Sequence, residues 1–293
     1  MTKKLLTIAM VAVFILGTTT RCTEITSKQR DETVASTEVD TVFITKSKAY
    51  TIREAHRGCS LGFPENTMPA FEKAIKIGTD RIELDVNITS DGVLIIMHDK
   101  TLDRTTDGEG VVTETSYAEI QKLDAGSWKS SEFKGLKIPT LKQVFELAKG
   151  KCMLNLDLKE ERVAKPMVKL ADEMGMIDQI VVTGKIPAAV NTIREINKGV
   201  TMFYELEKED VLNGPIEAVQ SIRNENLPGC LVNFEAVNDT FMKECKLHGI
   251  AVYTWGVLQE EDMNKLISLG VDGIMTDDLK LLNKVLNPNY KTL

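Results

Sequence analysis

The sequence predicts an α/β protein built as a (β/α)8 TIM-like barrel, and three observations support this prediction. Short apolar runs alternate with amphipathic stretches from residue 52 onward, a pattern typical of parallel strands joined by helical crossovers. Eight such units fit between residues 50 and 287, and barrels of this kind usually need about 250 residues. The alternative, a doubly wound open sheet, lacks the glycine-rich dinucleotide loop that would favour it.

The predicted strands are short runs rich in apolar and β-branched residues, whereas the predicted helices are longer and have apolar residues at helical spacing. We expect strands at residues 52–58, 81–88, 152–158, 179–184, 200–205, 230–234, 250–257 and 273–277. The clearest helical stretches are residues 68–78, 140–150, 164–175, 239–249 and 260–270. Each of these stretches ends in glycine, which is a common helix stop.

One connection breaks the alternation, because the run at 81–88 is joined to a second apolar run only by Ser90-Asp91-Gly92. Asp-Gly between apolar runs predicts a β-hairpin after the second strand. If Asp91-Gly92 is a two-residue loop, paired residue numbers sum to 183 and His98 lies opposite Asp85. We therefore expect the hairpin to bring this histidine beside the acidic residues of the second strand.

Residues 100–138 form a second interruption. This segment is too long for a simple connection and is rich in turn-forming residues. We expect it to fold as a small inserted subdomain over one end of the barrel, ending at Pro139-Thr140 where the next helix begins.

The N-terminus has the order of an export signal, in which a basic start precedes a 13-residue apolar run at 5–17 and then small residues. Residues 1–22 are therefore predicted to be a signal peptide, and the protein to be exported to the periplasm or to a bacterial membrane as a lipoprotein. Membrane attachment through Cys22 stays open, since a lipobox requires a small residue where Arg21 stands. The polar segment 23–48 predicts a tether, and residues 49–293 form the predicted barrel domain.

The chain is acidic, with a formal net charge of −7 at pH 7. Sequence-independent nucleic-acid binding depends on Lys and Arg that neutralise phosphates, so nucleic acid is not an expected partner. An anionic substrate would need a cation placed at the site. The cysteines at 59, 152, 230 and 245 lack CxxC spacing, and we expect buried free thiols rather than a disulfide framework.

Acidic residues recur on two predicted strands. Glu83 and Asp85 are separated by one residue, so both point to the same face of their strand. Asp157 lies on the next parallel strand, on a face shared with Lys159. Inside a barrel these three carboxylates would repel one another and need a cation, whereas on an exposed face they would simply be solvated. Ligation by oxygen atoms alone favours one divalent cation, Mg²⁺ or Ca²⁺.

Two of the three histidines, His56 and His98, lie near predicted strand ends and flank the carboxylates. Because histidine titrates near neutral pH, such a pair can supply a base and an acid in one reaction. Arg57 and Lys159 add positive charge that suits phosphate, so the constellation indicates phosphoryl chemistry. His248 stands at a predicted helix end before a glycine, and we expect a structural role for it.

A set of motifs, in order along the chain, resembles the glycerophosphodiester phosphodiesterases. The motifs are HRG, PENT, ELDV, SDG, MHD, RTTDGEG, LDAGSW, IPTL, LNLDLK, TW and GVDGIMTDD. They run from Ala55 to Asp278, nearly the whole mature domain. The resemblance implies a TIM-like barrel with a small inserted region. It also implies metal-dependent hydrolysis of a small glycerophosphodiester to sn-glycerol 3-phosphate and an alcohol.

The resemblance also implies roles for individual residues. His56 and His98 match the general acid–base pair, Glu83 and Asp85 match two metal ligands, and Arg57 resembles the phosphate-binding arginine. These assignments agree with the chemistry that the residue types indicate.

The third metal ligand departs from the family pattern, which usually has glutamate where this chain has Asp157. Aspartate is shorter by one methylene, roughly 1.5 Å of reach. The ion would therefore lie nearer this strand, be bridged by water, or differ in identity. Lys159 fits the lysine that the family has two residues further on.

Two further residues have alternative interpretations. Glu65 of PENT either braces its loop or contacts the metal through water, while Asn66 or Thr67 caps the next helix. Trp255 either lines the substrate pocket, together with Tyr253, or packs inside the barrel.

Other functions are also compatible with the sequence. Lysophospholipase D- or C-like activity on lipids would be favoured by apolar residues of the 100–138 insertion that face the site. A non-catalytic glycerophosphodiester-binding protein would be favoured by loss of a histidine, and neither is missing. A barrel glycosidase also uses paired carboxylates, but it would not depend on a divalent metal. The head group, the metal, the acid and base assignments of the histidines, and the oligomeric state are not fixed by the sequence.

Overall fold

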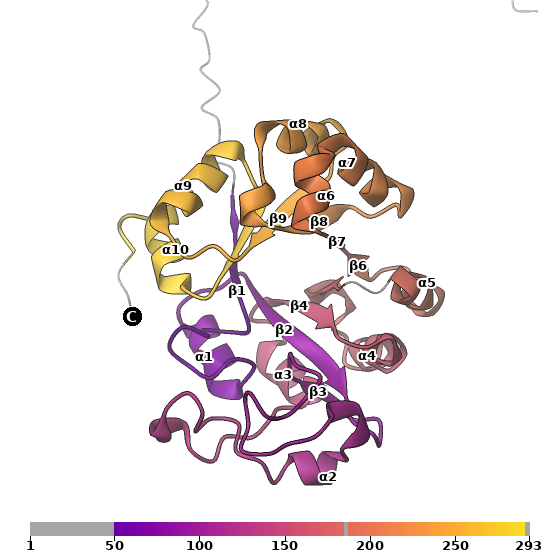
Figure 1. The fold of residues 1–293 in the computed structure, drawn as a ribbon, viewed down its shortest axis with the longest axis vertical. Helices are drawn as coiled ribbons and strands as arrows, with labels where there is room; N and C mark the ends of the chain where they lie inside the picture. Colours follow the sequence, from indigo (N-terminus) through magenta and orange to yellow (C-terminus); the bar gives the residue numbers. More distant parts are fainter. Residues whose placement is uncertain (1–49, 185–186, 291–293) are drawn as a thin grey trace, which may run out of the picture. The chain divides into compact units, whose positions relative to one another are not determined.

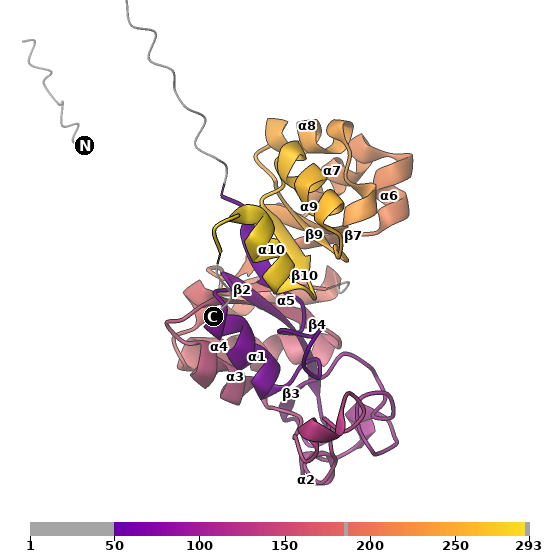
Figure 2. The same cartoon turned by 90° about the vertical axis from the view of Figure 1, so that its left-hand side faces the viewer.

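The computed structural model describes residues 50–184 and 187–290, so the predicted signal peptide, tether and Cys22 lie outside the described residues. The described part forms a nearly closed barrel of parallel strands with helices packed around it (Figures 1 and 2). The strands of the barrel are β1 (Ile52–Ala55), β2 (Arg81–Ile88), β4 (Met153–Leu158), β5 (Ile180–Thr183), β6 (Thr201–Met202), β7 (Tyr204–Leu206), β8 (Gly229–Asn233), β9 (Ala251–Trp255) and β10 (Gly273–Thr276). The predicted barrel is confirmed.

The strands follow one another around the barrel in the order β6-β5-β4-β2-β1-β10-β9-β8-β7, and all these neighbours are parallel. Only Phe203 separates β6 from β7, and its N–H donates to the carbonyl of Val182 on β5 across 3.0 Å. The two ends of the strand path are therefore consecutive pieces of one segment. With β6 and β7 taken as one position, the barrel has the eight strand positions that the sequence predicts.

Helices cover the outside of the barrel, and their apolar faces supply the outer half of the core. They are α1 (Met68–Lys76), α3 (Leu141–Ala148), α4 (Ala164–Glu173), α5 (Pro187–Ile196), α6 (Lys208–Asn213), α7 (Pro215–Asn224), α8 (Asp239–Leu247), α9 (Glu260–Leu269) and α10 (Leu279–Leu286). The five helical stretches expected from the sequence correspond to α1, α3, α4, α8 and α9. Short 3-10 helices occupy Val112–Glu114, Ser131–Phe133, Glu161–Val163, Ile177–Gln179 and Phe234–Ala236.

Local chemistry explains where these helices begin and end. The Thr140 side chain accepts a hydrogen bond from the Gln143 N–H, and the Gln143 side chain accepts one from the Thr140 N–H, a capping box that begins α3 where expected. α9 ends at Gly270, which adopts the left-handed conformation with φ 81°.

The hairpin after β2 forms, but the predicted register is wrong by one residue. β3 (Leu94–Ile96) pairs antiparallel with β2, and Val86 lies opposite Ile96. The loop has three residues, 90–92, and ends at Gly92 with φ 87°, a common three-residue hairpin geometry. Met97 therefore faces Asp85, to which it donates a backbone hydrogen bond of 2.9 Å. His98 lies beyond the end of β3, so strand pairing does not fix its position.

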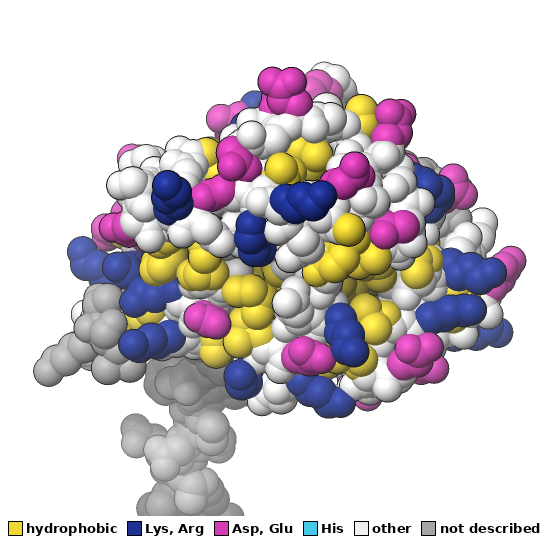
Figure 3. Space-filling model, turned by 90° about the horizontal axis from the view of Figure 1, so that it is seen from below, with side chains coloured by type: hydrophobic (Ala, Val, Ile, Leu, Met, Phe, Trp, Pro, Cys, Tyr) yellow, Lys and Arg dark blue, Asp and Glu magenta, His cyan; other side chains and the backbone are white. Residues whose placement is uncertain are grey.

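The predicted inserted subdomain forms, and it packs against the hairpin to make a second, small core. This core consists of the buried side chains of Ile95, Met97, Leu102, Val112, Ile120, Ala125 and Ile138. Within it lies the short helix α2 (Tyr117–Ile120), which begins with a capping box between Ser116 and Glu119. Figure 3 views the molecule from below Figure 1, the side on which α2 lies, and shows apolar side chains between scattered charges of both signs.

A buried ion pair lies inside the barrel near the strand N-termini. The Arg81 guanidinium is 2.5 Å from the Glu54 carboxylate, and both side chains are almost fully buried. Asn155 donates to Glu54 across 2.8 Å and accepts from Thr183 across 2.8 Å. Arg81 also lies 4.1 Å from the centre of the Tyr253 ring, a cation–π contact. These contacts form a buried polar layer inside the barrel.

The predicted state of the four described cysteines is confirmed. Cys59, Cys152, Cys230 and Cys245 are buried free thiols. Within residues 50–184 and 187–290, every helix is too short or too polar to cross a membrane.

The interior ion pair predicts a specific pattern of stability. Arg81→Met leaves Glu54 buried without its cation, and we expect it to lower the free energy of unfolding by about 3–5 kcal/mol in urea denaturation. The double variant Arg81→Met/Glu54→Leu removes both charges and should recover most of that loss. A double variant as unstable as the single one would show that the ion pair is not what matters at this position.

Candidate active site

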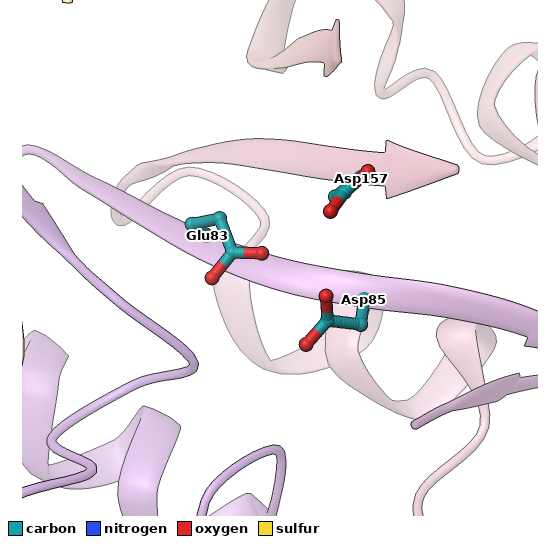
Figure 4. A group of neighbouring side chains, drawn as sticks. All are labelled: Glu83, Asp85 and Asp157. Carbon is teal, nitrogen blue, oxygen red and sulfur yellow. The ribbon is translucent and has the colours of Figure 1, made fainter. Parts of the chain in front are cut away.

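Three carboxylates converge on the neighbouring strands β2 and β4. Glu83 and Asp85 point from the same face of β2, and Asp157 lies directly beside Asp85 in the parallel pairing with β4. Figure 4 shows the three side chains facing a common space. One oxygen of each lies within 4.8 Å of the others. The period-two spacing on β2 and the adjacency of β4 therefore produce the predicted group of acids.

Burial gives these carboxylates unusual acidities. Burial, together with the negative charge of Asp85, raises the pKa of Glu83 to about 8. Burial likewise raises the pKa of Asp157, whereas the charges of Lys159 and Arg57 outweigh burial and lower the pKa of Asp85. Three oxygen donors with unbalanced negative charge suit a hard divalent cation. The group could therefore hold such an ion.

Two cations already contact the acidic group. Arg57 donates its backbone N–H to Glu83 across 2.9 Å, and its Nε lies 3.3 Å from an Asp85 oxygen. Lys159 lies 2.9 Å from the other Asp85 oxygen and also contacts Asp157. Both predicted cations are thus in the site, one after β1 and one after β4.

The turn that carries Arg57 is strained and closely packed. Arg57 has φ 53° and Gly58 has φ 82°, two successive left-handed residues directly after His56. A Cβ on Gly58 would come within 2.8 Å of the Ala70 backbone in α1, so the turn can be this tight only with glycine. The backbone strain places the Arg57 N–H against Glu83, and such strain is commonly found at functional sites.

His56 is held by a carboxylate from the last strand of the barrel. Its Nδ1 lies 2.7 Å from Asp277, which follows β10, and its Nε2 lies 3.9 Å from Glu83. The Ser60 hydroxyl is 2.7 Å from the same Asp277 oxygen and 2.8 Å from the His56 carbonyl. Burial lowers the pKa of His56, but the hydrogen bond to Asp277 and the charge of Glu83 outweigh it and raise that pKa.

His98 has a similar partner of its own. Its Nδ1 lies 2.6 Å from the carboxylate of the neighbouring residue, Asp99. Asp99 in turn accepts hydrogen bonds from Arg104 in the insertion. Those bonds, assisted by the one with His98, lower the pKa of Asp99 to about 2. Each histidine therefore has Nδ1 bound to a carboxylate, which leaves Nε2 as the nitrogen that can exchange a proton with substrate.

The PENT loop contacts the site through two residues. Glu65 pairs with Arg57 across 2.7 Å and with Arg104, so the structure shows bracing contacts for this carboxylate. Asn66 donates to Asp85 across 2.6 Å. Of the two capping residues expected, Thr67 occupies the N-cap position of α1, but its side chain makes no cap bond. The Asn66 amide is used instead to hold a candidate metal ligand.

The three carboxylates of the acidic group, the two histidines and the two cations line one pocket of about 610 Å³ at the carboxyl ends of the strands. Trp255, late on β9, lines it, whereas Tyr253 lies on Arg81 deeper in the barrel. His248 is exposed at the C-cap of α8 and does not line the pocket. The lining residues are His56, Arg57, Glu83, Asp85, His98, Lys100, Asp157, Leu158, Lys159, Thr183, Glu205, Leu231, Trp255 and Met275.

The contacts of four polar residues at the site could not be predicted from the sequence. Asp99, Arg104 and Asp277 belong to the motifs MHD, RTTDGEG and GVDGIMTDD, but their contacts depend on tertiary structure. Asn66 was interpreted as a cap. These motifs are rich in acidic and basic residues, which indicates that such residues are present at the site. The sequence does not indicate which of them pair with one another.

Polar side chains gathered at this end of a parallel barrel are typical of barrel enzymes, and comparisons with known proteins identify the class. The model of the glycerophosphoryl diester phosphodiesterase family matches residues 56–281. A glycerophosphodiester phosphodiesterase of Caldanaerobacter subterraneus is 35% identical over 237 residues, which are 78% of this chain and 94% of the relative. One of Bacillus subtilis is 30% identical over 249 residues, 79% of this chain and 85% of that protein.

Solved structures agree with these sequence relatives. A glycerophosphodiester phosphodiesterase from Agrobacterium tumefaciens has a TM-score of 0.71 and 26% identity, covering 80% of this chain and 99% of that one. An Oleispira antarctica phosphodiesterase, solved in complex with its product sn-glycerol-3-phosphate, has a TM-score of 0.73 and 25% identity, covering 80% and 96%. The chain therefore belongs to the glycerophosphoryl diester phosphodiesterase family and is a phosphoric diester hydrolase.

The His56–Asp277 contact predicts a change in acidity. Asp277→Asn removes the negative charge that stabilises the imidazolium, so His56 should lose its proton at a lower pH than in the wild-type protein. Titration of the histidine ring resonances by NMR measures this shift. His248, which is remote from Asp277, serves as the internal reference. An unchanged or raised pKa of His56 would contradict the prediction.

Proposed function

We propose that this protein hydrolyses small glycerophosphodiesters to sn-glycerol 3-phosphate and an alcohol, with His56 and His98 as the acid–base pair and one Mg²⁺ or Ca²⁺ at the acidic group. One observation carries the proposal: both histidines, each bound through Nδ1 to a carboxylate, line the same pocket as Glu83, Asp85 and Asp157. Family membership and the product-bound structure of a relative support the same chemistry.

The residues present fit a divalent ion held by Glu83, Asp85 and Asp157, because all three donors are oxygens and their charge is incompletely balanced. When bound, the ion would offset negative charge on the phosphate in the transition state. Lys159 contacts two of these acids and is close enough to share the phosphate.

The chain's own groups supply the remaining steps. Arg57 and Lys159 bind and orient the phosphate by charge-assisted hydrogen bonds. One histidine takes a proton from the nucleophile, which is water or the neighbouring glycerol hydroxyl. If the hydroxyl attacks, the alcohol departs and a cyclic phosphate forms, which water then opens to sn-glycerol 3-phosphate. The other histidine gives a proton to the departing alkoxide. Trp255 and the apolar residues Leu231 and Met275 form the wall where the organic part of the substrate lies.

The pocket favours small polar diesters over lipids. Within the described part of the chain, the insertion at 100–138 contributes Lys100 to the pocket lining and no apolar side chain. A lysophospholipase-like activity would use an apolar surface there for the acyl chain. A non-catalytic binding role does not account for two histidines that each have an orienting carboxylate.

The histidine assignment predicts loss of catalysis without loss of folding. His56→Ala and His98→Ala should each lower kcat for sn-glycerol 3-phosphate release by at least about 100-fold, the usual contribution of acid–base catalysis. Circular dichroism and thermal unfolding should match the wild-type protein, because neither ring lies in the apolar core. Near-normal hydrolysis by both variants would contradict the assignment of these two histidines as the acid–base pair.

The acidic group predicts metal dependence. EDTA should abolish hydrolysis of a panel of glycerophosphodiesters, and added Mg²⁺ or Ca²⁺ should restore it. Asp157→Asn should raise the metal concentration needed for half-maximal activity by about tenfold or more, with Asp178→Asn, outside the pocket lining, as the matched control. Full activity in excess EDTA would rule out a divalent ion at this site.

A further inference from the structure

A continuous series of charged contacts joins the two sides of the pocket. His98 Nδ1 lies 2.6 Å from Asp99 Oδ1, and Arg104 donates to both Asp99 oxygens across 2.5 and 3.0 Å. The same guanidinium donates to both Glu65 oxygens across 2.9 and 2.7 Å. Glu65 then accepts from Arg57 across 2.7 Å. Arg104 is the central member, because it contacts both Asp99 and Glu65, the two carboxylates that reach the pocket residues.

The local structure holds Arg104 in place although its side chain is 41% exposed. Leu102, two residues earlier, is 1% exposed in the small core of the insertion. The Thr106 hydroxyl donates to the Leu102 carbonyl across 2.6 Å and accepts from the Gly108 N–H across 3.0 Å. The loop that carries Arg104 is therefore anchored on both sides of it.

The geometry requires arginine in particular. The Nε, Nη1 and Nη2 atoms of Arg104 all donate hydrogen bonds, and together they bind two carboxylates in the fork geometry of a planar guanidinium. A lysine ammonium at this position would keep the charge but could not align two carboxylates. An isolated surface ion pair would contribute little, but here both acids have a second contact with a pocket residue.

We propose that Arg104 is a positioning residue for phosphodiester hydrolysis, holding the His98 ring through Asp99 and the Arg57 guanidinium through Glu65. This inference rests on the proposed function of His98 and Arg57. Arg104 does not itself line the pocket. Its loss should free the His98 ring to rotate, which lowers kcat, and free Arg57 to shift from the phosphate, which raises KM. The inserted subdomain thereby contributes to catalysis and not only to the shape of the site.

The kinetic test compares Arg104→Ala and Arg104→Lys with a control variant, Arg223→Ala. Arg223 is an exposed residue of α7. We expect Arg104→Ala to lower kcat/KM by about 10–100-fold, with changes in both kcat and KM. Arg104→Lys should recover only part of this loss, and Arg223→Ala should behave as wild type. Because the side chain is partly exposed, millimolar methylguanidinium should partly rescue Arg104→Ala but not His98→Ala. Wild-type kinetics in Arg104→Ala would overturn the inference.

A measurement independent of activity separates this inference from the proposed function. With only three histidines in the chain, ¹⁵N-labelled imidazoles can be assigned from the His→Ala variants. In Arg104→Ala the His98 ring nitrogens should shift, while those of His56, bound to Asp277, should not. Unchanged His98 signals would overturn the positioning role. If the wild-type protein hydrolyses no glycerophosphodiester, the proposed function fails, while the NMR comparison still decides whether Arg104 orients His98.

Discussion

The structure depends on the electrostatic problem of placing three carboxylates side by side at one end of a barrel. Glu83 and Asp85 are almost fully buried, and neither could remain charged there without nearby cations. The compensation comes from separate segments, with Arg57 after β1 and Lys159 after β4. The strained turn at Arg57 and the position of Lys159 both serve to place positive charge beside the buried carboxylates. The same unbalanced charge makes the site suitable for a divalent ion and an anionic phosphate.

The barrel and most of the site could be predicted from the sequence because they depend on local periodicity. Glu83 and Asp85 share a face by the period of two along a strand. Asp157 joins them because consecutive parallel strands are neighbours. The register of the hairpin could not be predicted in this way, because a three-residue loop and a two-residue loop both fit Ser90-Asp91-Gly92, and the two differ by one residue in pairing.

The partner of His56 and the partners of Arg104 could not be predicted from the sequence for a different reason. Asp277 lies 221 positions from His56, and only the closure of the barrel brings β1 beside β10. Arg104 reaches Asp99 and Glu65 through a loop whose path follows from the core of the insertion. The ion pair between Arg81 and Glu54 inside the barrel could not be predicted from the sequence either, because it also depends on the tertiary fold. Composition and spacing indicate that such groups are present, but only the tertiary fold decides which of them meet.

The pairing of β1 with β10 has a consequence for when the active site exists. Asp277, the carboxylate partner of His56, is translated 221 residues after it. A nascent or C-terminally truncated chain can hold the acidic residues of β2 and β4, yet it lacks the strand that orients this histidine. Contacts between residues so far apart in sequence are made late and slowly in folding. The contact between His56 and Asp277 therefore cannot form until β10 has been made and has paired with β1.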